Sequence, residues 1–260
     1  MTEASAPPPS RIPELRDIQF SDLRAALGRG WADYRRAPAF GLFFSAVYVA
    51  GGLLLYYALA TTGKIWWSVP VTVGFPILGP FTAVGLYEVS RRLERGEPLV
   101  WSEVLGVIFR QKDRQIPSMS AIVVVFFLFW NFIGHMIFAL FLGLQVMTNV
   151  SSSFAVYLTP AGLSMLAVGT AVGAAFALVL FALTVISLPL LLDREVDFVT
   201  AMITSLRCVI ANPVTMLSWG ALITVSLFLG MAPAFLGLFI VLPVLGHASW
   251  HLYRLALDDG

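Results

Sequence analysis

The 260-residue chain has little charge and a single cysteine, and both shortages narrow the classes of protein that it can be. Asp, Glu, Lys and Arg make up 12% of the sequence, against roughly 25% in soluble globular proteins. Hydrophobic residues make up 58%, which excludes soluble enzyme classes and indicates a polytopic membrane protein. The one cysteine, Cys208, excludes a disulfide framework and a cysteine-rich metal site. The net charge of +1 excludes a basic nucleic-acid-binding protein.

The sequence also lacks the motifs of common enzyme classes and lacks charge within its hydrophobic runs. It contains no GxSxG, HExxH, Walker-type or dinucleotide-binding motif, so we predict no enzyme and no catalytic residue. Proton relays and ion-coupled carriers usually place a charged group at mid-membrane, and no such group falls there. A proton-driven transporter is therefore disfavoured. We expect no metal site and no bound cofactor.

The first twenty residues have the composition of neither a targeting peptide nor a membrane span. They contain Glu3, Glu14 and Asp17 together with the proline run 7–9, and they have no apolar segment. Low hydrophobicity and proline are typical of disordered chain. We therefore predict a disordered cytoplasmic tail over residues 1–20, followed by a single six-helix transmembrane domain over residues 21–257.

The uncharged runs of the sequence predict six transmembrane helices in an all-α membrane protein. A membrane-spanning helix needs about 20 mostly apolar residues, so two short runs hold one helix each and two long runs hold two each. Thr159 and Pro160 mark the loop in the first long run, and Gly230 marks the turn in the second. Pro233 is placed at the first position of the last helix. The predicted spans are residues 38–62, 65–88, 118–146, 161–192, 213–230 and 233–254.

The distribution of Lys and Arg predicts the orientation of these spans. Lys64 is the one basic residue on one side of the predicted membrane, and the other fifteen of the sixteen Lys and Arg residues fall on the opposite side. Because cytoplasmic loops carry the excess of Lys and Arg, both termini should be cytoplasmic. The lipid bilayer is then the first partner of the chain.

A threefold pattern recurs along the sequence. An amphipathic segment, a proline and a pair of hydrophobic runs follow one another three times, which favours three repeats of an interfacial helix plus a helical hairpin. In the first segment, apolar Leu23, Leu27, Trp31 and Tyr34 repeat at helical spacing, and Asp33 lies off that stripe. Chance similarity among apolar helices is the alternative. The amphipathic segments are residues 21–36, 101–114 and 198–211, and the prolines that follow them are Pro38, Pro117 and Pro213.

The second helix of each predicted hairpin carries proline late in its course. A proline inside a helix leaves one carbonyl without its usual partner and kinks the axis. Such kinks can shape a cavity for a solute, but they also occur in membrane proteins that transport nothing. The predicted kinks lie at Pro76, Pro80, Pro189 and Pro243.

The three histidines are the candidates for binding haem or another cofactor. His247 and His251 share one face of the sixth predicted helix, and His135 lies on the third. A rise of about 1.5 Å per residue separates His135 from His247 by roughly 15 Å in depth, too far for one shared site. The alternative is that His247 bonds a neighbouring helix and that His251 lies at the membrane interface.

Two further groups of residues are candidates for contacts with other helices, lipids or proteins. Gly169 and Gly173 form a GxxxG motif, which favours close helix packing, either within the chain or between two copies. Charged clusters follow the second and fourth predicted helices and are candidates for docking a partner or a lipid headgroup. The alternative is that they pair with one another at solvated helix ends. The candidates are Glu88, Arg91, Arg92, Asp193, Arg194 and Asp197.

Several longer motifs carry a resemblance to a known family. They are the segment from Trp31 to Pro38, the segment from Val84 to Arg92, the segment from Leu190 to Met202 and the segment from Leu242 to Arg254. Over roughly residues 15–257 the chain resembles a family of predicted integral membrane proteins with a domain of unknown function, mostly from proteobacteria. The resemblance implies a bacterial inner membrane and no established activity. Some relatives carry the label cytochrome c oxidase subunit I. That subunit is catalytic and has many more spans and histidine ligands than this chain.

Two functional hypotheses follow. The first is a non-catalytic accessory or assembly partner of another inner-membrane complex, motivated by short external loops, an uncharged core and the absence of catalytic motifs. The second is a small permease or channel for a neutral or apolar solute, motivated by the predicted kinks. Haem or metal binding through the histidines is a third. A polar-lined central cavity would favour the permease, and a tightly packed centre with apolar flanks would favour the accessory protein. The sequence leaves the oligomeric state undetermined.

Overall fold

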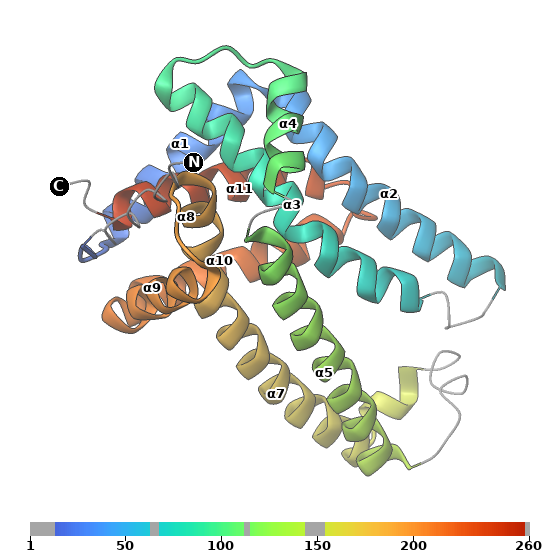
Figure 1. Ribbon diagram of the computed structural model, residues 1–260. Coiled ribbons are helices and arrows are strands. Elements are labelled where there is room, and N and C mark those ends of the chain that lie inside the picture. The colour runs from blue at the N-terminus through green and yellow to red at the C-terminus, as the bar shows by residue number, and fades with distance from the viewer. Residues whose placement is uncertain (1–13, 63–67, 112–114, 144–153, 258–260) are drawn as a thin grey trace, which may run out of the picture.

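The computed structural model describes residues 14–62, 68–111, 115–143 and 154–257, and this part of the chain is helical with no strand. An isolated bridge between Leu15 and Leu257 is its one β-type pairing. The elements are α1 Phe20–Arg36, α2 Pro38–Thr62, α3 Ser68–Arg95, α4 Trp101–Gln111, α5 Ile116–Leu142, η2 Phe154–Leu158, α7 Pro160–Thr184, α8 Ser187–Asp193, α9 Phe198–Ala211, α10 Pro213–Met231 and α11 Leu238–Ala256. Figure 1 shows the long helices α2 and α3 side by side and α5 and α7 side by side, with the shorter helices α1, α8 and α9 gathered at one end of them.

Three amphipathic helices, α1, α4 and α9, each lead into a long helix through a proline, and we call them the lead helices. The first and third lead helices end in the same elbow. Ala37 has φ −132° and ψ 51°, and Asn212 has φ −124° and ψ 54°. A residue before proline is pushed out of the α region, and proline itself fits the first position of the next helix. The dipeptide at each elbow therefore ends one helix and starts another.

The second lead helix differs from the other two. The residue that caps α5 is Gln115, with φ −97° and ψ −14°. Pro117 is the second residue of α5, whereas Pro38 and Pro213 are the first residues of their helices. The link between α4 and α5 includes residues 112–114, which lie outside the described residues. The first and third units are thus alike in their elbows, and the second is not.

The three lead helices pack against the hairpins in a cyclic order. α1 lies along α11, α4 lies against α3, and α9 lies against α7 and α8. Each lead helix therefore contacts the second helix of the hairpin that precedes its own, and α1 closes the circle by contacting the last hairpin. The ends of these second helices, α3, α8 and α11, also contact one another at the centre of the fold.

Proline breaks one of the second helices and is tolerated in the other two. α7 ends at Thr184 and α8 begins at Ser187, so the helix is interrupted just before Pro189. Proline has no N–H for the carbonyl four residues earlier, which explains the position of this break. Pro243 lies inside α11, and Pro80 lies inside α3. Pro76 falls in the part of α3 of which only the backbone is described.

The structure corrects two boundaries. The predicted disordered tail of residues 1–20 is wrong from residue 14 onward, because Arg16 N bonds to Ala256 O at 3.0 Å and Ile18 is buried. Residues 1–13 lie outside the described residues. The last helix begins at Leu238 rather than at Pro233, because Ala234 (φ 51°) and Phe235 (φ 66°) adopt left-handed backbone conformations that a helix cannot contain.

Four helical segments are long and apolar enough to cross a membrane, by length and composition, among the residues that the structure describes. They are Pro38–Ala58, Ile116–Leu142, Pro160–Asp193 and Pro213–Met231. The other two helices of the hairpins, α3 and α11, do not meet this criterion. The large apolar side chains of α5 and α10 are widely exposed, with Phe132 at 69% and Phe228 at 67%, which suits a lipid environment.

Candidate functional site

A fully buried carboxylate lies at the centre of the charged end of α3. Glu88 is 0% exposed and accepts hydrogen bonds from Arg91 Nε at 2.7 Å and from Arg92 Nε at 2.7 Å. Arg92 also donates to Pro98 O at 3.0 Å and to the carboxylate of Glu103 on α4. Charge-assisted bonds of this kind are stronger than neutral ones. They join the end of α3 to the loop after it and to the second lead helix.

Asp193, at the end of α8, joins the three central helices. Its Oδ2 accepts a hydrogen bond from Tyr253 OH on α11 at 2.9 Å. Arg254 of the same helix lies 3.6 Å from this carboxylate, and Arg95 of α3 lies 3.5 Å from it. The Asp193 side chain is 8% exposed, so its negative charge is offset within the protein.

The remaining charged candidates also have roles inside the fold. Arg194 is the residue that ends α8, and its N–H donates to Leu190 O at 2.9 Å. Asp197 caps α9 by accepting a hydrogen bond from Thr200 N at 2.9 Å. A second bond, from the Thr200 hydroxyl, lowers the pKa of Asp197, together with the backbone bond. The six charged candidates are thus placed at the ends of three helices and are engaged there.

Two histidines of α11 form a buried polar cluster with α1 and α3. His251 Nε2 lies 2.7 Å from Asp33 Oδ2, and Asp33 is 4% exposed. His247 Nδ1 lies 2.8 Å from Ser90 Oγ and 3.1 Å from Leu86 O. His247 Nε2 is buried and has no hydrogen-bond partner among the described residues. The cluster links α1, α11 and α3 where they cross.

The structure keeps His135 apart from this cluster. His135 lies on α5, is exposed, and bonds through Nδ1 to Asn131 O of its own helix at 2.7 Å. No group of three or more His, Cys, Asp or Glu residues that could hold a metal occurs in the described ranges. The sole thiol is buried on α9, and burial raises the pKa of Cys208 to about 12, so it is a poor nucleophile.

The pair formed by His251 and Asp33 should be measurable as a coupling energy. We expect Asp33→Ala and His251→Ala each to lower the free energy of unfolding by about 1–3 kcal/mol, because each leaves a buried partner unsatisfied. The stability loss of the double variant should be smaller than the sum of the losses of the two single variants by at least about 0.5–1 kcal/mol. Unfolding in detergent measures all three.

A cycle between His251 and the exposed Arg24 of α1 is the matched control, and it should show additivity within about 0.5 kcal/mol. Equal additivity in the Asp33 cycle would show that the two side chains do not interact.

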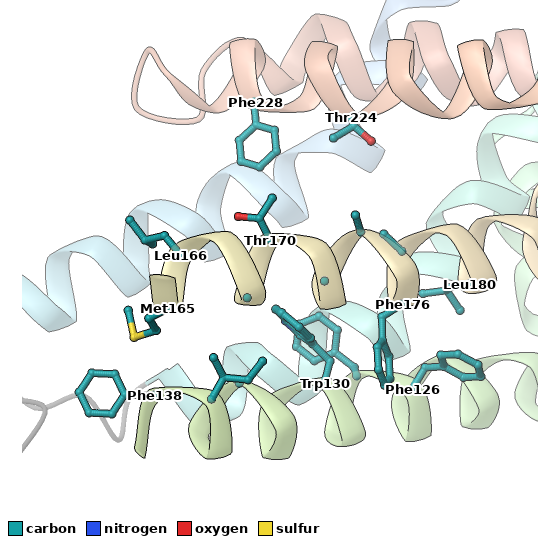
Figure 2. A pocket seen from close by; sticks show the side chains of 17 residues that line it. Phe126, Trp130, Phe138, Met165, Leu166, Thr170, Phe176, Leu180, Thr224 and Phe228 are labelled. Carbon is teal, nitrogen blue, oxygen red and sulfur yellow. The ribbon is translucent and has the colours of Figure 1, made fainter. Parts of the chain in front are cut away.

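An apolar pocket of about 710 Å³ lies outside the packed centre, between α5, α7 and α10. Figure 2 shows Phe228 and Thr224 of α10 facing Leu166 and Thr170 of α7, with Trp130 and Phe138 of α5 along the other side. We call this pocket the hairpin groove. Its lining is Phe126, Phe127, Trp130, Gly134, Ile137, Phe138, Met165, Leu166, Gly169, Thr170, Gly173, Ala174, Phe176, Ala177, Leu180, Thr224 and Phe228.

Both glycines of the GxxxG motif line the hairpin groove. A Cβ added at Gly173 would lie 2.8 Å from Trp130 Cη2, so this glycine accommodates the indole of α5. A Cβ added at Gly169 would meet no described atom within 4 Å. One glycine therefore serves packing within the chain, and the other leaves open space in the groove.

Residues 68–193 match the model of a family described as predicted integral membrane protein (DUF2189). The match runs from the start of α3 to the end of α8, within the broader region from residue 15 to residue 257 over which the motifs suggest a resemblance. No curated protein and no solved structure matches the chain significantly. This chain is an integral membrane protein. Its apolar long helices and its charged, mutually paired helix ends agree with that description.

The roles of several residues of the site were not predicted from the sequence. Asp33 was expected on the polar face of α1, but it faces α11 together with the small residues Ala26 and Gly30. The spacing of Ala26, Gly30 and Asp33 by four and three positions is a signal that was available. Trp31, which belongs to the apolar stripe of the same segment, is 45% exposed. Glu103 pairs with Arg92, and Ser90 pairs with His247. No local spacing in the sequence predicts either contact.

Proposed function

We propose that the chain crosses a bacterial inner membrane six times, with both termini cytoplasmic, as three related units of lead helix plus hairpin. The matching elbows at Ala37 and Asn212 and the cyclic packing of the lead helices support the three units. α3 and α11 serve as spans because each pairs with an apolar helix, α2 or α10. This pairing offsets the free-energy cost of inserting helices with polar ends into the membrane. The excess of Lys and Arg on one side supports the orientation.

We propose that the protein is a non-catalytic accessory or assembly partner of another inner-membrane complex. The observation that carries this proposal is the closed centre of the fold. Glu88 is held by two arginines of its own helix, and His247 of α11 is bonded to Ser90 of α3. The large side chains of Trp219 and Trp250 are fully buried in the core. A permease needs a polar path through the centre, whereas the large pocket of this protein is apolar and lies on its flank.

Co-purification tests the accessory role. Tagged protein is cross-linked in native membranes, extracted in mild detergent and analysed by mass spectrometry. We expect one or more membrane proteins in stoichiometric amount. A photo-reactive amino acid at the exposed Phe132 should capture such a partner, and the same group at the buried Trp219 is the matched control and should capture none.

A homogeneous monomer or homo-oligomer without a partner, even after cross-linking, would contradict the accessory role. Uptake of a neutral solute by proteoliposomes would then support the permease.

A further inference from the structure

The hairpin groove lies where the three hairpins fail to close on one another. α2 packs against α11, and α5 packs against α3, so two of the first helices cover the second helix of the preceding hairpin. The third such helix, α10, makes few contacts with α7. The groove is the gap that this leaves. Because α5, α7 and α10 are all long and apolar enough to cross a membrane, its opening faces the hydrocarbon region of the bilayer.

The lining of the groove excludes a buried polar ligand. Among the described residues that line it, the polar side-chain groups are the hydroxyls of Thr170 and Thr224 and the indole N–H of Trp130. The Thr224 hydroxyl donates to Gly220 O of its own helix at 2.9 Å. A polar group without a hydrogen-bond partner costs several kcal/mol in an apolar site. The occupant of the groove is therefore hydrocarbon.

The length of the groove distinguishes an acyl tail from a partner's membrane-spanning helix. The lining residues of α7 run from Met165 to Leu180, a length of about 22 Å at 1.5 Å per residue. A spanning helix crosses about 30 Å of hydrocarbon and would extend beyond the groove, whereas an acyl tail occupies one leaflet, roughly half of that thickness, and fits within it.

We propose that the hairpin groove binds the acyl tail of a bilayer phospholipid as a structural lipid, with the headgroup outside the groove at the membrane surface. The tail covers Trp130, Phe138 and Phe228 and replaces the missing contact between α10 and α7. The open position at Gly169 leaves room for the tail against the backbone of α7. This inference does not depend on the accessory role.

Native mass spectrometry of the protein released from nanodiscs of phosphatidylethanolamine and phosphatidylglycerol tests the proposal. We expect about one retained phospholipid per chain. Gly169→Leu should lower the retained fraction by about tenfold, because its side chain displaces about two methylenes of the tail from a position where an added Cβ meets no described atom within 4 Å. Ala171→Leu places the same side chain on an exposed position of α7 outside the groove and should leave retention unchanged.

Gly134→Leu repeats the test from α5, where an added Cβ also meets no described atom within 4 Å, in case Gly169→Leu does not fold. Loss of lipid in this variant alone would support the proposal. Equal retention in all variants would overturn it, as would a wild-type chain without bound lipid. Retention of an isoprenoid lipid or of a partner's helix in place of a phospholipid would also overturn it.

Discussion

Gly30→Ala should destabilise the protein by about 2–3 kcal/mol, because α1 and α11 approach each other at this glycine. A Cβ at position 30 would lie 2.6 Å from Ala248 N and 2.7 Å from Val244 O. Both atoms belong to the backbone of α11, so no side chain can rotate away to relieve the contact. The two helices must separate, and the nearby pair of Asp33 and His251 should weaken with them.

Gly28→Ala on the same helix is the matched control. No described atom lies within 4 Å of a Cβ at this position. Alanine favours a helix over glycine by about 0.5–1 kcal/mol, so this variant should be more stable than the wild type. Thermal unfolding in detergent measures both variants. Trypsin cleavage at the exposed Arg24 and Arg29 should accelerate in Gly30→Ala alone. Shifts of the same sign in the two variants would show that α1 does not pack as described.

The second large effect concerns Glu88. Glu88→Ala should cost about 3–5 kcal/mol, because it removes the buried acceptor that two arginines share and leaves Glu103 as the one carboxylate paired with Arg92 among the described residues. The side chain of Arg92 is 10% exposed and remains close to Glu103, so it cannot turn fully to solvent. We expect a lower unfolding temperature and faster proteolysis of the segment between α3 and α4.

Glu97→Ala is the control for the loss of a carboxylate at the same end of α3, where Glu97 pairs with Arg95 instead. Its side chain is 40% exposed and lies 4.0 Å from Arg95, so the loss should be about 0–1 kcal/mol. Glu88→Gln should fall between the two, because it keeps an acceptor and loses the charge. Equal unfolding temperatures for Glu88→Ala and Glu97→Ala would mean that the buried pair adds nothing to stability.

The helices could largely be predicted from local pattern. The span predicted over residues 38–62 coincides with α2, and the break before Pro189 follows from a covalent property of proline. The start of α11 could not be predicted, because proline at position 233 is typical of a helix start. The helix begins later because a left-handed turn follows Pro233, and this turn forms around a close contact of Gly230 with Gly237. The number of spans remains a prediction beyond the four helices that meet the length and composition criterion.

In the site, too, some contacts could be predicted from the sequence and others could not. Glu88 and Arg92 are four residues apart on one helix, so their pairing was readable from the sequence. The burial of Asp33 was not, because hydrophobic spacing placed this residue on the outer face of α1. Only its partner, His251, explains why a carboxylate faces inward, and the two residues are 218 positions apart.

The sequence by itself determined that this is a helical membrane protein, where its helices lie and where proline ends or breaks them. These properties depend on hydropathy and backbone chemistry within about 20 neighbouring residues. Only the tertiary structure decided which lead helix packs on which hairpin, which charges are paired and where the hairpin groove opens. These depend on contacts between segments far apart in the chain, and the apolar faces of its helices are too alike for local composition to specify their neighbours.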